Sequence, residues 1–418
     1  MGAIREGQAA ARASAGAAPS ISPLALLLVV GSLMTVSALA TDVMLPAFPT
    51  MARAFGVSDA TIQQVVSVFM LGYALPQFLI GSLADRFGRR PVLVGGLLVY
   101  LAGSVACLAA PSLGWLLAGR FVQGLGSAAG PILSRAVLRD LYAGAELGRM
   151  LSYAMIVFSA APLLAPAIGA LMLRLGNWEL IFVFLLLVAV ALIALVLLAL
   201  PETLARPDPD ALRLGGVWRN AVRVAGDPRS AWSLLFMTFT YAGLMAYLLS
   251  ASALYIGWFG LDESGFALVF AVVAATSFVT QPVNARLLRR YEPVQVVGVA
   301  LPAFLVVGAL MLVQALLGAL TLVTFVVSVS AFFACFSFIM GNGTTMALDP
   351  HEERAGIASG LLGFAQLALG TALGALIGGF AEHGPVALAT GLTLLALLAY
   401  PCYRLAARRG DAPSDRLT

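Results

Sequence analysis

Long apolar runs are the feature of this sequence that most limits its possible folds. Segments of about 20 mostly apolar residues follow one another along the 418 residues, and only 11% of all residues are charged. A helix of this length spans the hydrocarbon core of a bilayer. Lipid offers the backbone no hydrogen-bond partners, so a spanning segment must be a helix or part of a closed barrel. Continuous runs, without alternation of apolar and polar residues, favour helices. We therefore expect an all-α integral membrane protein, with the lipid bilayer as its surroundings.

Turn residues and charges between the runs define twelve predicted spans. Their residues are 21–45, 60–83, 91–110, 113–138, 150–175, 180–200, 231–256, 266–285, 294–316, 320–346, 356–380 and 386–403. The longest interruption separates six spans from six, which indicates two pseudo-symmetric six-helix halves. We expect an N-terminal tail (1–20), a first half (21–200), a linker (201–230), a second half (231–403) and a C-terminal tail (404–418). Within the linker, 212–224 could form an amphipathic helix on the membrane surface, although a solvated connector is the simpler interpretation.

The arginines predict the orientation of the chain. All 24 basic residues are Arg, and most of them fall in the two tails, the linker and the loops on one side of the membrane. The loops of the other side hold only Arg53 and Arg174, against five acids. Because positively charged loops stay in the cytoplasm, both termini are expected there. The arginines form no basic face, so nucleic-acid binding is not expected.

The loop between the second and third predicted spans reads GSLADRFGRRP, residues 81–91. It resembles the signature of the major facilitator superfamily, in which the pattern Gly-x-Leu-Ala-Asp-Arg-x-Gly-Arg-Arg occupies this place. The resemblance implies the major facilitator fold and transport by alternating access. A turn that merely carries positive charges is the alternative interpretation.

The same resemblance implies a latch between the two halves on the cytoplasmic side. Glycines in the loop would allow a tight turn and close helix approach. In the family the loop Asp faces the start of span eleven, here 356–360, where the helix dipole favours an anion. The second loop Arg would pair with an acid at the end of span four. The residues expected in the latch are Gly81, Asp85, Arg86, Gly88, Arg89 and Asp140.

Three further motifs narrow the resemblance. Span four contains RFVQGLGSAAG, which is similar to a motif of proton-coupled facilitators and implies a functional Arg120 inside the span; a side chain that reaches the outer interface is the alternative. Span five contains APLLAPAIGALM, which resembles the antiporter motif through Pro166 and Gly169, while Pro162 and Pro166 should kink the helix. With TDVMLPAFP, PETL and AGIASGLLGF, the pattern most resembles the Bcr/CflA drug-resistance group of bacterial inner-membrane exporters. Gly370, Gly374 and Gly378 share one face of the eleventh span. We expect this face to contact the second span, which belongs to the other half.

Asp42 is the leading candidate for proton coupling, because it is the only acid within a span once helix ends are excluded. Burial favours the protonated carboxyl, whereas a nearby guanidinium favours the ionised one. If Asp42 approaches Arg120 in one conformation and leaves it in another, its proton affinity changes during the cycle. The alternative interpretation is a helix cap ahead of Pro46.

Substrates of facilitators bind near the bilayer midplane, between the two halves. Polar and aromatic residues inside the spans are therefore candidate ligands: Tyr73, Gln77, Gln123, Tyr241, Tyr247, Asn342 and Gln366. An apolar, aromatic cavity with few charges suits lipophilic or mildly cationic molecules better than sugars or phosphorylated metabolites.

The sequence thus predicts a monomeric, proton-driven exporter of lipophilic drugs or similar small molecules. Export of a sugar, an amino-acid derivative or another metabolite is the alternative function. A membrane enzyme is disfavoured because the two histidines, His351 and His383, fall on opposite sides of the membrane, and no HExxH or GxSxG motif is present. No catalytic residue, metal or cofactor is expected. A channel is disfavoured by the alternating-access motifs.

Overall fold

The structure is a computed structural model that describes residues 22–209, 211, 222, 224–349 and 355–410. Every regular element in these ranges is helical. Most of the predicted amphipathic helix at 212–224 lies outside the described residues. So do the whole predicted N-terminal tail (1–20), residue 21 and residues 411–418 of the C-terminal tail.

Each predicted span of the first half corresponds to a helix or a short series of helices. The elements are α2 (Pro23–Asp42), η1 (Leu45–Ala47), α3 (Phe48–Phe55), α4 (Asp59–Ile62), α5 (Gln64–Ala74), η2 (Leu75–Phe78), α6 (Ile80–Phe87), α7 (Arg89–Leu108), α8 (Leu113–Ser127), α9 (Ala129–Leu141), α10 (Gly144–Leu175) and α11 (Glu179–Ala199). α10 continues through Pro162 and Pro166 as one helix.

The second half follows the same order of long helices. Its elements are α13 (Pro228–Ser252), the π-helix η3 (Ala253–Trp258), α14 (Glu263–Leu287), α15 (Pro293–Leu316), α16 (Leu322–Leu348), α17 (Ala355–Ala365), the π-helix η5 (Gln366–Gly370), α18 (Thr371–Gly378), η6 (Ala381–His383) and α19 (Pro385–Gly410). The eleventh predicted span is thus two α-helices joined by a π-helical turn.

Hydropathy and length support a multi-pass membrane protein. Ten helices of the described chain are long and apolar enough to cross a membrane, and eleven are if the α4–α6 series, which bends by 50°, counts as one span. The remaining predicted span corresponds to α8 and α9, which have 15 and 13 residues and are separated only by Ala128. The twelve predicted spans therefore all have helical counterparts.

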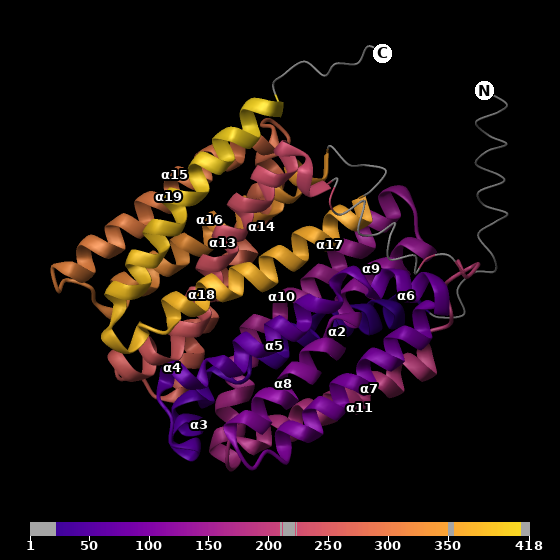
Figure 1. Ribbon diagram of the computed structural model, residues 1–418, viewed down its shortest axis with the longest axis horizontal. Coiled ribbons are helices and arrows are strands. Elements are labelled where there is room, and N and C mark those ends of the chain that lie inside the picture. Colours follow the sequence, from indigo (N-terminus) through magenta and orange to yellow (C-terminus); the bar gives the residue numbers. More distant parts are fainter. Residues whose placement is uncertain (1–21, 210, 212–221, 223, 350–354, 411–418) are drawn as a thin grey trace.

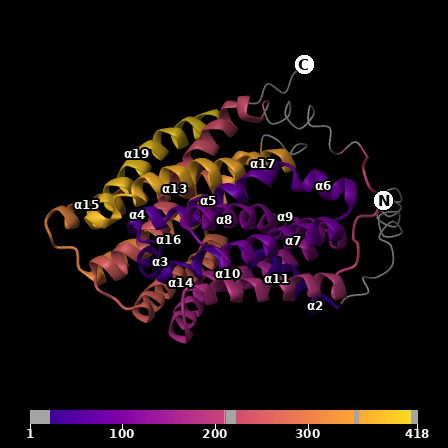
Figure 2. The same cartoon turned by 60° about the horizontal axis from the view of Figure 1, so that its bottom comes forward.

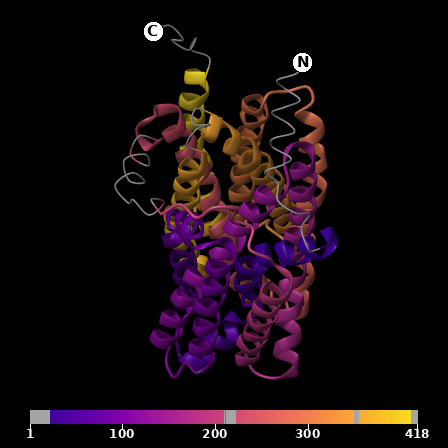
Figure 3. The same ribbon diagram turned by 90° about the vertical axis from the view of Figure 1, so that its right-hand side faces the viewer.

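The helices form two groups that meet along one boundary. In Figure 1 the indigo-to-magenta helices α2–α11 fill the lower part of the molecule, and the pink-to-yellow helices α13–α19 fill the upper part. The same separation is visible from the side of α6 in Figure 3. At the boundary α5 runs beside α17 and α18, as Figure 2 also shows. We call the end that holds Arg86, Arg89 and Arg90 the basic end, and the end that holds Asp59 and Glu382 the opposite end.

Glycines bring the backbones of the first half into direct contact. A Cβ at Gly124 would lie 2.2 Å from the carbonyl oxygen of Phe69, and one at Gly130 would lie 2.4 Å from that of Leu33. These distances leave no room for any side chain. Small residues at helix interfaces are the usual means of close packing in membranes, where lipid offers no hydrophobic driving force.

The glycines of the eleventh span pack differently from our expectation. Gly370 lies against Tyr241, and Gly374 lies against Met245, both in α13 of the same half. Only Gly378 reaches the second span, where a Cβ would meet the Gln63 side chain at 2.8 Å. The predicted contact across the halves is therefore wrong for Gly370 and Gly374. The glycine face allows α18 to lie close to α13, its neighbour within the bundle.

We predict that Gly126→Ala destabilises the protein. Its Cβ would lie 2.2 Å from the backbone nitrogen of Tyr100 in α7, so the two helices must separate. Overpacking of this kind costs about 1–3 kcal/mol, and it would be measured as a lower melting temperature in detergent. Gly114→Ala in the same helix is the matched control, because nothing lies within 4 Å of its Cβ. Equal melting temperatures for the two variants would contradict the prediction.

Candidate functional site

Arg120 lies at the centre of a buried polar network in the first half. Its side chain is completely buried, although arginine is the most hydrophilic residue in α8. The guanidinium donates to the carbonyl oxygens of Val65 in α5 (3.1 Å) and Ala40 in α2 (3.2 Å). It also donates to the side-chain oxygen of Gln123 and lies 4.2 Å from the ring centroid of Phe69, a favourable cation–π distance.

The network continues into α7. The amide nitrogen of Gln123 donates to the hydroxyl oxygen of Ser104 at 2.8 Å, and that hydroxyl donates to the carbonyl oxygen of Tyr100 at 2.9 Å. Arg120 therefore joins four helices, and its depth excludes the alternative in which it reaches the outer interface. Gln123, which we predicted to bind substrate, instead accepts from Arg120 inside the helical packing.

Asp42 occupies the last position of α2, beside the short helix η1. The residue is 5% exposed. Gly169 of the antiporter-like motif packs directly against this point, because its Cβ would lie 2.1 Å from the carbonyl oxygen of Val43. α10 thus holds the helix end that carries Asp42. Arg120 donates to the backbone carbonyl of Ala40, which precedes Asp42 by two residues in α2. The two residues predicted to couple protons are therefore linked through the last turn of α2.

A second set of polar residues lies between the two groups of helices. Tyr73 is next to the side chains of Ser37 and Gln77, and it is within electrostatic range of Tyr241 in the second half. Tyr241 is in turn within electrostatic range of Asp42. We call Asp42, Tyr73, Gln77 and Tyr241 the central cluster. The structure therefore brings three of the predicted substrate ligands and the predicted proton carrier together at the boundary.

The other predicted ligands have separate positions. Tyr247 is fully buried among aromatic rings of the second half, with its ring stacked on Phe270. The amide nitrogen of Asn342 donates to the side-chain oxygen of Asn284 (2.9 Å) and to the carbonyl oxygen of Phe338 (2.8 Å). Asn342 therefore links α16 to α14 by a hydrogen bond. Its amide nitrogen already has two acceptors within the bundle.

Gln366 lies at the start of the π-helix η5, and its amide nitrogen is buried with no hydrogen-bond partner among the described residues. Single π-helical turns are frequent at functional sites. A buried, unpaired amide donor is available to a ligand, which keeps Gln366 among the candidates.

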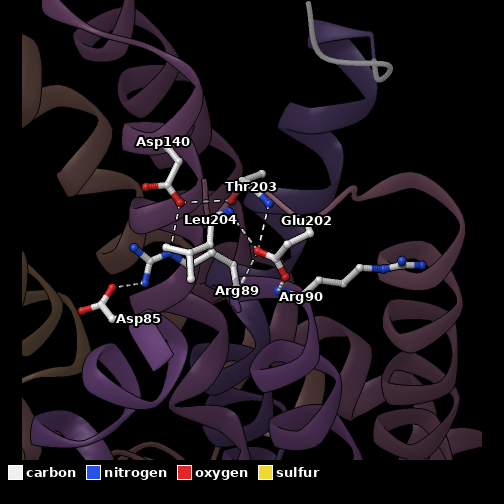
Figure 4. Close-up of polar contacts among 7 residues, drawn as sticks. All are labelled: Asp85, Arg89, Arg90, Asp140, Glu202, Thr203 and Leu204. Carbon is white, nitrogen blue, oxygen red and sulfur yellow. Dashed lines mark hydrogen bonds and ion pairs between the residues drawn. The ribbon is translucent and has the colours of Figure 1, made fainter. Parts of the chain in front are cut away.

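The basic end holds the charged cluster shown in Figure 4. The guanidinium of Arg89 donates to the carboxylate of Asp85 at 2.5 Å and to that of Asp140 at 3.0 Å. The Arg89–Asp140 pair is the one expected within the latch. Arg86 instead lies 5.4 Å from the ring centroid of Phe87. Asp85 lies in α6, Arg89 begins α7, and Asp140 is in the last turn of α9, so the cluster ties the second, third and fourth spans together.

Glu202, from the PETL motif after α11, completes this cluster. Its carboxylate accepts from the backbone N–H groups of Arg89 (2.9 Å) and Arg90 (3.1 Å), as Figure 4 shows. These are the first amides of α7, which have no partner within the helix, and the helix dipole favours an anion there. Thr203 donates its hydroxyl to Asp140 at 3.0 Å. The PETL motif by itself does not indicate this capping role, because the amides that Glu202 caps lie more than 100 residues earlier in the chain.

The two latch glycines differ in what they do. Gly88 has φ = +99°, a conformation that favours glycine, and a Cβ there would lie 2.5 Å from the Glu202 carboxylate. At Gly81 a Cβ would meet open space among the described residues, so the close approach expected there is absent from this structure. The Asp85 side chain is 47% exposed. Its expected contact with residues 356–360 stays a prediction, because the side chains of 356–358 lie outside the description.

Contacts between the halves also occur at the opposite end. The carboxylate of Glu382 accepts from the backbone N–H of Ala60 at 2.7 Å. Arg174 at the end of α10 donates to the hydroxyl of Ser264 at the start of α14 at 2.5 Å. At this end, the start of the second span is thus held to the segment after the eleventh span, and the end of the fifth span is held to the start of the eighth.

A separate apolar groove of about 480 Å³ lies between α14, α15 and α16. Val299 in its wall is 74% exposed, and the groove contains none of the central cluster. It faces the surroundings of the bundle and does not belong to the boundary between the halves.

Residues 30–375 match the family model of the Major Facilitator Superfamily. The chain belongs to this superfamily. It is 29% identical to a bicyclomycin resistance protein homolog of Haemophilus influenzae, with 85% of this chain and 89% of the relative covered. It is 27% identical to multidrug resistance protein D of Escherichia coli, with 90% and 94% covered.

Solved structures agree on the fold of this facilitator. A D-xylose–proton symporter superimposes with a TM-score of 0.66 at 13% identity, over 90% of this chain and 97% of that chain. A human organic anion transporter superimposes with a TM-score of 0.62 at 20% identity, over 92% and 99%. The predicted family and fold are confirmed, together with the multi-pass membrane architecture.

We predict that Arg120→Lys lowers both stability and transport. A lysine ammonium cannot reach two backbone carbonyls and Gln123 with the planar geometry of a guanidinium. At least one buried acceptor then loses its partner, at a cost of about 1–3 kcal/mol. Melting temperature and initial transport rate should both fall, while Arg53→Lys, at an exposed arginine, changes neither. A normal rate and melting temperature in Arg120→Lys would show that the network is dispensable.

We predict that Glu202→Gln loosens the first turn of α7. A neutral amide loses the charge-assisted bonds to the amides of Arg89 and Arg90, at a cost of about 1 kcal/mol. Hydrogen–deuterium exchange of the peptide that contains these amides should accelerate. Glu146→Gln is the control, because that exposed acid pairs only with Arg149, at 3.7 Å. Unchanged exchange in Glu202→Gln would refute the capping role.

Proposed function

We propose that this facilitator exports lipophilic drugs or similar small molecules in exchange for protons, by alternating access. The names of its relatives in Haemophilus influenzae and Escherichia coli support drug resistance as the function. One observation supports proton coupling most directly: Asp42 is the only Asp or Glu among the buried residues of the described chain. A buried acid that reaches the boundary between the halves is a natural proton carrier.

The central cluster supports a shared site for substrate and proton. Asp42 lies within electrostatic range of Tyr241, which belongs to the other half and packs on Gly370. A molecule bound between Tyr73 and Tyr241 would therefore be close to the carboxyl group. Movement of one half against the other would change these surroundings and with them the proton affinity of Asp42.

The arginine distribution supports an inner-membrane protein with both termini in the cytoplasm. The basic end is then cytoplasmic, and the contacts of Glu382 and Arg174 close the periplasmic side. Arg120 serves to position the helix end that carries Asp42. The Arg89 cluster acts as the cytoplasmic latch through the predicted contact of Asp85 with residues 356–360 of the second half. We propose that the protein works as a monomer, because each half supplies one wall of a single site.

The decisive experiment is gradient-driven transport in proteoliposomes. We predict that Asp42→Asn abolishes uphill drug accumulation under an imposed pH gradient, because a neutral amide cannot carry a proton. Glu146→Gln is the control, since Glu146 is an exposed acid that pairs with Arg149 on α10 and has no part in the proposed site. Accumulation at the wild-type level in Asp42→Asn would exclude Asp42 as the proton carrier.

A substrate panel separates drug export from the alternative of metabolite export. An efflux-deficient strain that expresses the protein should gain resistance to lipophilic drugs and retain its sugars and amino-acid derivatives. Loss of a metabolite without any gain of drug resistance would favour the alternative.

A further inference from the structure

One charged side chain at the boundary has no place in the scheme above. Arg135 lies in α9, between Ser134, whose hydroxyl donates to the carbonyl oxygen of Val30 at 3.2 Å, and Asp140, which pairs with Arg89. These contacts fix the rotation of α9 about its axis. Unlike its buried neighbours Ser134 and Val137, Arg135 is exposed.

One residue of the central cluster, Tyr73, is close enough to Arg135 to interact with its charge. The Arg135 guanidinium lies within electrostatic range of the Tyr73 hydroxyl, which is itself next to Ser37 and Gln77. Tyr73 is in range of Tyr241 across the boundary. Arg135 is therefore at the basic-end side of the site, more than one helical turn deeper than Asp140. The positive-inside rule accounts for arginines in loops, but it does not account for one at this depth.

The charge of Arg135 is not neutralised within the described chain. No described carboxylate lies within 4 Å of its guanidinium, and the ion pairs found elsewhere belong to Arg89, Arg149 and Arg229. The acid of the central cluster, Asp42, is buried at the far end of α2. A molecule that enters from the basic end would thus meet the positive charge of Arg135 first and then the phenol and amide groups of Tyr73 and Gln77.

We propose that Arg135 determines substrate charge: it binds an acidic group, such as a carboxylate, on the exported molecule and disfavours cations. This inference rests on the proposed export function and narrows its substrate class from lipophilic or mildly cationic molecules to lipophilic acids and neutral compounds. A guanidinium matches the two oxygens of a carboxylate with parallel hydrogen bonds. The hydroxyl of Tyr73, which is within electrostatic range of this guanidinium, is a further donor near it.

Binding of three probes with one aromatic body tests the proposal. 1-Naphthylacetate, 1-naphthylmethanol and 1-naphthylmethylammonium differ chiefly in charge, and their affinities for the purified protein would be measured by equilibrium dialysis in detergent. We predict that the wild type binds the acid about ten-fold more tightly than the amine, as expected for one solvated unit charge at close range. Arg135→Gln should reduce that ratio to about one, and Arg135→Glu should reverse it.

Arg139→Gln is the matched control, because Arg139 is an exposed arginine of the same helix, four residues nearer its end. It should keep the wild-type ratio. The proposal is overturned if Arg135→Gln keeps the wild-type ratio, if the wild type prefers the amine, or if it does not bind the acid. Failure of the export function is distinguishable, since it would appear as absence of gradient-driven transport in proteoliposomes while the binding ratio still responds to Arg135.

Discussion

The burial of one guanidinium is the constraint on which the first half of this facilitator depends. A charged group removed from water must find partners, and Arg120 finds them on three other helices: the carbonyl oxygens of Ala40 and Val65, and through Gln123 the hydroxyl of Ser104. These partners fix how α2, α5, α7 and α8 lie around one another. Because Ala40 is two residues from Asp42, the same network also positions the candidate proton carrier.

Close contacts between helix backbones hold the first six-helix half together as one unit. Gly124 and Gly130 bring α8 and α9 against α5 and α2, and Gly169 brings α10 against the backbone at Val43. At the basic end, the carboxylates of Asp85, Asp140 and Glu202 surround Arg89. Such a half can move as one body, which is what alternating access requires. Deformation would be confined to the boundary, where α5 faces α17 and α18.

The sequence predicted what depends on local pattern and fell short where the outcome depends on helix rotation. Apolar runs located every span, and the loop motif located the Arg89–Asp140 pair. Sequence spacing did not reveal that Gln123 and Asn342 form hydrogen bonds between packed helices, or that Gly370 contacts α13. These contacts depend on which neighbouring helix each helix face meets, and spacing does not determine that. Glu202 and Arg135 were missed for the same reason: their partners are distant in sequence, and a charge near a span end resembles an ordinary loop charge.

The two charges at the boundary bear on energetics as well as recognition. Arg135 interacts electrostatically with Tyr73, and Asp42 does so with Tyr241, so an acidic molecule and a proton would occupy the site through different groups. Export of a monoanion in exchange for one proton moves two positive charges inward per cycle. With the cytoplasm negative, a membrane potential of 100 mV then contributes about 5 kcal/mol. Export of a neutral drug in exchange for one proton would move one charge and use half of that driving force. Arg135 would therefore favour the substrates whose export gains most from the membrane potential.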